Sequence, residues 1–192
     1  MKILGIDPGL RLTGYGVIAA AGVKPALIDG GVIRLNTKSS IPDRLVELER
    51  ELQAIVAEHK PEICAVEQLY SNYAHPRTAI LMGHARGVIL LVARRNKMEI
   101  REFAANRVKQ ATVGHGHAAK GQMQRAIQAI WSLPELPEPP DVADALAVAL
   151  CCANSMLRGR SSSIPLPRRR SGAAVLRGLG VSSMPRTVPV RL

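Results

Sequence analysis

The order in which strand-like and helix-like segments follow one another constrains the fold of this chain most. Three apolar runs rich in β-branched residues come first, and the first of them stops at the turn Asp7-Pro8-Gly9. From residue 41 onward, segments with apolar residues at spacings of three and four alternate with short, compact apolar runs. Three consecutive strands followed by alternating helices and strands predict an α/β fold, with a mixed five-stranded sheet flanked by helices on both faces.

The individual elements can be placed from the same patterns. We predict strands at residues 2–6, 14–20, 26–35, 63–67 and 98–103, and helices at residues 41–60, 74–95, 104–113, 118–131 and 141–157. The first three strands should form an antiparallel meander. Aromatic residues are scarce, which predicts a core made mainly of aliphatic side chains and alanine. The single tryptophan, Trp131, is expected to be a core residue. Gly83 and Gly87 would allow close packing of the second helix.

Charge divides the chain into two unequal parts. The formal net charge is +11, but residues 158–192 hold eight of the 26 basic residues and no acid, so residues 1–157 carry 18 basic and 15 acidic groups, or +3. We predict one domain over residues 1–157 and a disordered, Arg/Ser/Pro-rich tail over residues 158–192. Such a tail suits a polyanion such as nucleic acid, and it is equally compatible with a solvated segment that has no specific partner.

The sequence disfavours a protein held together by disulfides or cysteine-bound metal, and it disfavours a membrane or secreted protein. Cys64, Cys151 and Cys152 lie in apolar stretches without a CxxC pair, which favours small buried residues over disulfides or metal ligands. We identify no run of about 18 apolar residues and no signal-peptide pattern at the N-terminus. A soluble, cytoplasmic protein without a membrane partner is therefore expected.

Four carboxylates stand where predicted elements begin or end. Asp7 follows the first strand and Glu67 ends the fourth, while Asp141 and Asp144 share one face at the start of the last helix. Carboxylate oxygens are the ligands that Mg²⁺ prefers, and two such ions can hold the attacking and leaving oxygens of a phosphodiester displacement. Carboxylates that converge without a cation repel one another. The four acids together therefore indicate a metal site.

Each acid taken alone also has an ordinary structural explanation. Asp7 before Pro-Gly suits a turn, and Asp141 and Asp144 suit the first turn of a helix, where acids cap the backbone. Glu67 is harder to explain in this way, because it follows a predicted buried strand, where an unpaired charge is costly. The metal site is inferred from the set rather than from any single member.

Several segments resemble, in order and spacing, the RuvC family of Holliday junction resolvases, and the resemblance covers residues 1 to about 155. The matching segments are Gly5-Ile6-Asp7-Pro8-Gly9 with Thr13-Gly14-Tyr15-Gly16; Ala65-Val66-Glu67-Gln68 with Tyr70; Gly83-His84-Ala85-Arg86-Gly87; Val108-Lys109-Gln110 with Val113-Gly114; and Asp141-Val142-Ala143-Asp144-Ala145-Leu146-Ala147. The resemblance implies an RNase H-like fold. It also implies a crossover junction endodeoxyribonuclease that acts in DNA recombination and repair.

The resemblance carries specific expectations for the site and its partners. The four acids Asp7, Glu67, Asp141 and Asp144 would be the catalytic residues and would bind Mg²⁺ or Mn²⁺, with two ions expected per site. The family works as a homodimer that makes paired, symmetric nicks in a four-way junction and leaves 5′-phosphate and 3′-hydroxyl ends. It is associated with the RuvA–RuvB branch-migration complex.

DNA contacts are expected at four further positions. Lys109 and Lys120 match basic positions that contact DNA in the family, and Lys120 also begins a predicted helix, where backbone donors bind phosphate. Tyr70 stands where the family often has Phe, and an aromatic ring there can stack on a base. Arg77 is a second-rank candidate, as are Arg86 and Arg11, and a solvated surface position remains the alternative for each.

Some residues allow other interpretations. His115 and His117 form an HxH pair, but no Cys or His cluster completes a transition-metal site, so a loop near DNA is favoured. Actin-like ATPases and sugar kinases also begin with a strand and a Gly-Ile-Asp-x-Gly turn, but they need two such lobes. A binding module that has lost the chemistry would gain nothing from four acids that face phosphate.

Overall fold

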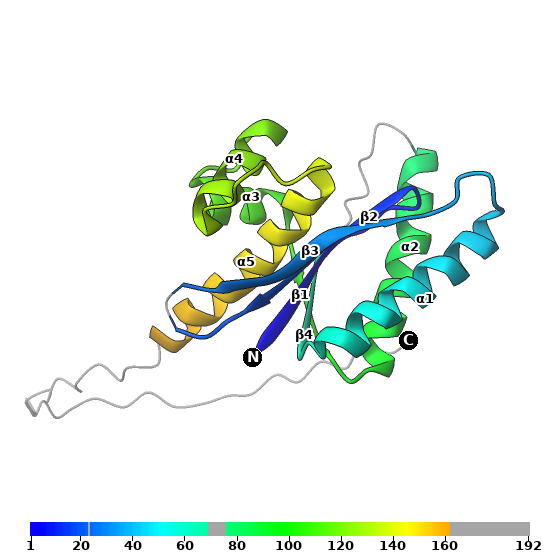
Figure 1. Ribbon diagram of the computed structural model, residues 1–192, viewed down its shortest axis with the longest axis horizontal. Helices are drawn as coiled ribbons and strands as arrows, with labels where there is room; N and C mark the ends of the chain where they lie inside the picture. The colour runs from blue at the N-terminus through cyan, green and yellow to red at the C-terminus, as the bar shows by residue number, and fades with distance from the viewer. Residues whose placement is uncertain (23, 69–75, 162–192) are drawn as a thin grey trace, which may run out of the picture.

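Five strands form one mixed sheet in the computed structural model of the protein, which describes residues 1–22, 24–68 and 76–161 (Figure 1). The strands are β1 (Lys2–Asp7), β2 (Leu12–Ala19), β3 (Ala26–Arg34), β4 (Ile63–Glu67) and β5 (Glu99–Phe103), in the spatial order β3-β2-β1-β4-β5. The first three strands pair antiparallel, and β4 joins β1 and β5 in parallel. The predicted meander and mixed sheet are confirmed.

Helices cover both faces of this sheet, as predicted (Figure 1). They are α1 (Ile41–His59), α2 (Pro76–Arg95), α3 (Ala105–Val113), α4 (Lys120–Trp131) and α5 (Pro140–Ser161). One face carries α1 and α2, and the other carries α5 with α3 and α4 packed against it. The last helix runs to Ser161, past its predicted end at residue 157. Residues 162–192 of the predicted tail lie outside the described residues.

Side-chain alternation along the central strands separates two hydrophobic cores. Ile3 packs into the core beneath α5, whereas Leu4 and Ile6 pack into the core beneath α1 and α2. In β4, Ile63 and Ala65 belong to the α5 side. Since successive side chains of a strand point to opposite faces, the odd-numbered residues of both strands face α5.

Three glycines form the surface on which α5 is seated. A Cβ atom at Gly5 would lie 2.3 Å from the carbonyl oxygen of Ala145, and one at Gly14 would lie 2.0 Å from that of Asp141. At Gly16 it would meet a leucine of α5 at 2.5 Å. By contrast, a Cβ at Gly83 or Gly87 of α2 would have no atom of the described residues within 4 Å. The prediction that these two glycines allow close packing within the chain was therefore wrong.

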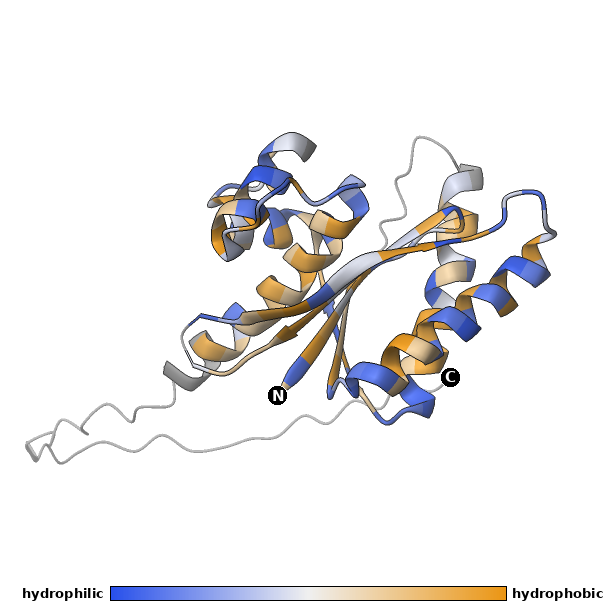
Figure 2. Ribbon diagram, viewed as in Figure 1, coloured by the Kyte–Doolittle hydropathy of each residue, from blue (hydrophilic) through white to orange (hydrophobic). Residues whose placement is uncertain are grey.

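The last helix is apolar almost all round, as its colour shows in Figure 2. By length and composition its stretch Pro140–Leu157 could cross a membrane, and sequence inspection did not identify this run. Most of the stretch is buried, and it packs on β1 and β2. A helix that is buried between other elements is expected to be hydrophobic on all sides.

The cysteines and Trp131 behave as the sequence predicts. All three thiols are buried, and burial raises the pKa of Cys64 to about 12 and that of Cys152 to about 11. Thiols of this kind stay protonated at neutral pH and are poor metal ligands. Trp131 packs against the core, and its indole nitrogen donates a 2.9 Å hydrogen bond to the carbonyl of Pro25.

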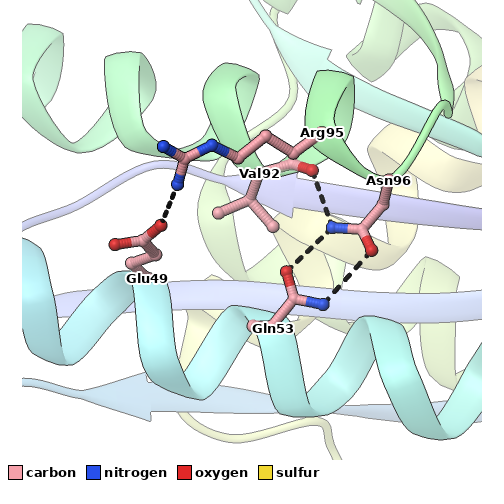
Figure 3. Close-up of polar contacts among 5 residues, drawn as sticks. All are labelled: Glu49, Gln53, Val92, Arg95 and Asn96. Carbon is pink, nitrogen blue, oxygen red and sulfur yellow. Dashed lines mark hydrogen bonds and ion pairs between the residues drawn. The ribbon is translucent and has the colours of Figure 1, made fainter.

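Polar side chains connect α1 and α2 along the outer side of their layer (Figure 3). Arg95 donates to Glu49 at 2.6 Å. Gln53 and Asn96 exchange two hydrogen bonds, of 2.8 and 3.2 Å. The same two helices also contribute apolar side chains to one buried core.

Candidate active site

Two of the predicted acids lie at the carboxyl ends of neighbouring parallel strands. Asp7 is the last residue of β1, and Glu67 is the last residue of β4. The register pairs Ile6 with Val66, so the two acids follow one residue later at the same edge of the sheet. Both occupy odd-numbered positions, so strand alternation directs their side chains to the face that α5 covers.

The first turn of α5 brings the other two acids to this edge. Gly14 pairs with Asp7 in the sheet, and the backbone of Asp141 approaches Gly14 so closely that a side chain there would collide with it. Asp144 follows three residues later, on the same side of the helix. The four acids Asp7, Glu67, Asp141 and Asp144 all line one cleft of about 870 Å³. The structure thus brings together the set that the sequence singles out.

The electrostatics of the cleft centre on Glu67. Burial raises the pKa of this carboxyl above its usual value, the nearby charge of Asp144 raises it further, and the charge of Lys109 opposes both effects. Like charges that share a site raise one another's pKa values. Although all four acids line the cleft, residues 1–22, 24–68 and 76–161 contain no group of three acidic, His or Cys side chains close enough together to hold an ion.

The turn that follows Asp7 is fixed by a buried hydroxyl. Thr13, which is fully buried, donates a 2.6 Å hydrogen bond to the carbonyl of Gly9 and accepts one of 3.3 Å from its backbone nitrogen. A Cβ atom at Gly9 would lie 2.1 Å from the carbonyl oxygen of Leu12. The tight turn therefore holds the end of β1, and with it Asp7, in one place.

Arg86 braces the other strand end rather than projecting toward solvent. Its guanidinium donates a 2.6 Å hydrogen bond to the backbone carbonyl of Glu67 and also pairs with Glu102 of β5. The sequence suggested Arg86 as a second-rank DNA contact. In the structure its donors are engaged in positioning Glu67, a role that the sequence did not indicate because the partner is a backbone atom far along the chain.

The predicted DNA contacts are described to different extents. Lys109 of α3 and Arg11 both line the cleft. Arg77 and Lys120 lie in the first turns of α2 and α4, but their side chains are outside the described part. Tyr70 lies wholly outside the described residues.

The histidine pair lies in the loop that joins α3 and α4. His115 and His117 are both exposed there. No metal-binding cluster that includes either histidine occurs among the described residues. The pair thus lies in a loop, and the nearness of this loop to DNA stays a prediction.

One cleft residue was missed by the sequence analysis. Arg44, in the first turn of α1, lines the cleft together with the four acids. In the sequence it is one of several charged residues on an amphipathic helix, a pattern that indicates a solvated face. No local signal distinguishes it from its exposed neighbour Arg50, because the distinction arises only when α1 packs beside the Asp7 turn.

A mixed sheet in this strand order, with acids at the ends of β1 and β4 and two more on the last helix, places the chain among nucleases of the RNase H-like class. Residues 3–152 match the family described as "Crossover junction endodeoxyribonuclease RuvC". The chain belongs to this RuvC family, whose members are endonucleases that act on four-way DNA junctions.

Individual relatives agree with the family assignment. A crossover junction endodeoxyribonuclease RuvC of Rhodopirellula baltica is 46% identical over 149 residues, which cover 78% of this chain and 84% of that protein. Thermus thermophilus RuvC is 32% identical with a TM-score of 0.73, and covers 83% of this chain and 97% of its own. The structure of the same protein in complex with a Holliday junction substrate is 33% identical with a TM-score of 0.77. The match covers 83% of this chain and 96% of that chain. The predicted family, fold and endonuclease activity are confirmed.

Proposed function

We propose that the cleft is the active site at which this chain resolves four-way junctions by paired, symmetric, metal-dependent nicks. The observation that carries the proposal is the convergence of Asp7, Glu67, Asp141 and Asp144 from three separate elements on one cleft. The T. thermophilus relative, described in complex with a Holliday junction substrate, supports the same DNA as the substrate here. Such cutting would serve DNA recombination and repair.

The donor set of the cleft fits Mg²⁺, with Mn²⁺ as a substitute. Carboxylate oxygens are hard ligands that suit both ions. Burial raises the pKa of Glu67, the nearby negative charge of Asp144 raises it further, and a bound cation would oppose both effects. We infer two ions held by the four acids. When bound, such a pair activates the attacking water and stabilises negative charge on the leaving 3′-oxygen.

The remaining cleft residues hold the DNA and the acids in position. The ammonium group of Lys109, close enough to influence Glu67, would bind a backbone phosphate next to the one that is cut. Thr13 and Arg86 keep the two strand ends fixed, so that the acids need little rearrangement as the reaction proceeds. Attack by water with the 3′-oxygen as leaving group yields a 5′-phosphate and a 3′-hydroxyl, ends that a ligase can seal.

Three further residues are proposed to contact the junction around the cleft. Lys120 is the first residue of α4, where backbone N–H groups and its ammonium group can hold one phosphate. Arg77 lies at the start of α2. Tyr70 would stack on a base that is unpaired at the crossover. Substituting each by alanine should weaken junction binding, which a gel-shift titration measures.

Two symmetric nicks require two active sites, so we propose a homodimer. Helix α2 offers a face for it, because Ile80 and Leu91 are exposed at 60% and 47%, and the uncovered Gly87 lies between them at helical spacing. Leu91→Asp should shift the protein to monomers in light scattering after gel filtration. Val46→Asp, at an exposed position of α1, is the control and should leave the dimer intact.

The family also supports a cytoplasmic protein that works with the RuvA–RuvB branch-migration complex. Purified RuvA and RuvB should then increase the rate at which this protein cuts a junction that can migrate. An unchanged rate on such a junction would argue against this partner and would leave the active-site proposal untouched.

The direct test compares a labelled synthetic four-way junction with a linear duplex of the same sequence. With Mg²⁺, the junction should receive paired nicks at symmetric positions, the products should be sealed by DNA ligase, and EDTA should abolish the reaction. The linear duplex should stay intact. Tight junction binding without cutting in either Mg²⁺ or Mn²⁺ would contradict the proposal.

A further inference from the structure

A cationic side chain of the cleft has no partner within the part of the protein that the structure describes. The Nε atom of Arg44 is buried and makes no hydrogen bond. None of the ion pairs formed by the described residues includes Arg44. Its helix neighbour Arg50, by contrast, pairs with Glu51 at 2.8 Å. A guanidinium that is partly removed from water without an acceptor is unfavourable, so such a group suits an acceptor that arrives from outside.

The place of Arg44 in the fold tells us where that acceptor would lie. Arg44 comes from α1, on one face of the sheet, whereas Lys109 comes from α3, on the opposite face. Both line the cleft, and the acids at the ends of β1 and β4 belong to the sheet edge between these two layers. Helices α1 and α3 lie on opposite sides of the sheet (Figure 1), so the two cations of the cleft come from opposite layers of the molecule.

A DNA strand that crosses the acids would meet one cation on each side. Its phosphates carry oxygen acceptors, and the planar guanidinium can donate two parallel hydrogen bonds to one phosphate, which a lysine cannot do. We propose that Arg44 binds a backbone phosphate of the strand in the cleft, on the side of the acids opposite Lys109. The inference rests on the proposed active site, because it assumes that the strand to be cut passes over the acids.

The test measures junction binding without cutting. Fluorescence anisotropy with a labelled synthetic four-way junction in EDTA, from about 50 to about 200 mM salt, gives the dissociation constant and its salt dependence. Arg44→Gln should raise the dissociation constant about tenfold and reduce the slope of log K against log salt by about 0.9, the value for one phosphate contact. Arg44→Lys should restore the slope but only part of the affinity.

The matched control is Arg50→Gln, which removes the same charge from the same helix at a side chain that is 71% exposed. It should change the dissociation constant less than twofold. Equal effects of Arg44→Gln and Arg50→Gln, or a wild-type slope for Arg44→Gln, would overturn the proposal. A lower melting temperature for both Arg44→Gln and Arg44→Lys, with equal loss of binding, would also overturn it, because an internal structural contact would then explain the residue.

Two different measurements distinguish a failure of this inference from a failure of the proposed active site. Asp7→Asn tests the acids through cutting in Mg²⁺, and Arg44→Gln tests the phosphate contact through binding in EDTA. Normal cutting by Asp7→Asn would refute the acid site while a changed salt slope for Arg44→Gln still supported the contact. Loss of cutting by Asp7→Asn with an unchanged slope for Arg44→Gln would refute the contact alone.

Discussion

The two helical layers that enclose the sheet are held to it in different ways. Helix α5 lies directly on glycines of β1 and β2, where even one methyl group at Gly5 or Gly14 would collide with its backbone. Helices α1 and α2 pack through ordinary aliphatic side chains, and polar pairs such as Arg95–Glu49 join them at the surface (Figure 3). The first arrangement fixes a single position for the helix, whereas the second tolerates adjustment.

This difference matches the distribution of the cleft residues. Two acids belong to the sheet and two to α5. The close packing of α5 on the glycines of β1 and β2 fixes the positions of the two pairs of acids relative to each other. Metal-assisted chemistry depends on ligands held within a fraction of an ångström. The α1–α2 layer supplies no acid to the set, but it provides Arg44 and the exposed face of α2. The acids thus come from the sheet and from the rigid α5 layer, whereas the proposed DNA contacts come from both layers, with Lys109 and Lys120 on α3 and α4 and Arg44 on α1.

The largest expected effect is on the rate of cutting, which should depend on an acid of the α5 layer and not on an acid of the α1–α2 layer. Asp144→Asn on α5 should lower the single-turnover rate of junction cutting in Mg²⁺ at least 1000-fold, equivalent to about 4 kcal/mol, because it removes the charge of a proposed metal ligand. Junction binding should change little. Glu49→Gln, an exposed acid of α1, is the control and should cut at the wild-type rate. A rate for Asp144→Asn within tenfold of wild type would remove α5 from the active site.

The same Gly→Ala change should have opposite signs in the two layers. Gly5→Ala should lower the free energy of unfolding by about 3 kcal/mol, because its methyl group overlaps the backbone of α5. Gly83→Ala in α2 should raise it by about 0.5–1 kcal/mol, since there is open space and alanine favours a helix. Urea unfolding measures both. Similar effects for the two variants would show that the layers do not differ as described.

A smaller effect is expected at Glu67, where the charged carboxylate lowers the stability of the fold but is needed for cutting. Its pKa is raised in the folded protein by burial and by Asp144, so its contribution to stability falls as the pH rises from the ordinary glutamate pKa through the raised value. Glu67→Gln should therefore melt at a higher temperature than wild type at neutral pH, with the difference vanishing in acid. It should not cut. A difference in melting temperature that is constant with pH would contradict this account.

The surface contacts between α1 and α2 should matter least. Arg95→Ala and Gln53→Ala should each lower the free energy of unfolding by less than about 0.5 kcal/mol, because exposed ion pairs and hydrogen bonds exchange for water at little cost. Cutting should be unaffected. A loss above 2 kcal/mol for either variant would mean that the α1–α2 layer also depends on specific contacts.

Much of the fold could be predicted because its strands and helices are indicated by patterns of residues that are close in the sequence. The turn at Asp7-Pro8-Gly9 and the spacing of apolar residues locate strands and helices without tertiary information. The acids could be proposed for the same reason, since Asp7 and Glu67 directly follow strand-like runs. The family resemblance added their shared role and the association with junction DNA.

The features that could not be predicted depend on contacts between distant segments. Thr13 and Arg86 act on backbone atoms that no sequence pattern marks as partners. Arg44 is distinguished from Arg50 only by its place beside the Asp7 turn. The seat for α5 did leave a signal, because Gly14 and Gly16 lie at strand spacing, where paired glycines indicate a close approach of another backbone.

We propose that the four acids at the end of the sheet form one metal site, and Mn²⁺ binding tests this proposal most directly. Titration of the protein with Mn²⁺, followed by electron paramagnetic resonance, should reveal two bound ions per chain. Asp7→Asn, Glu67→Gln, Asp141→Asn and Asp144→Asn should each weaken or abolish that binding, whereas Glu49→Gln should not. Wild-type Mn²⁺ binding in all four variants would contradict the account.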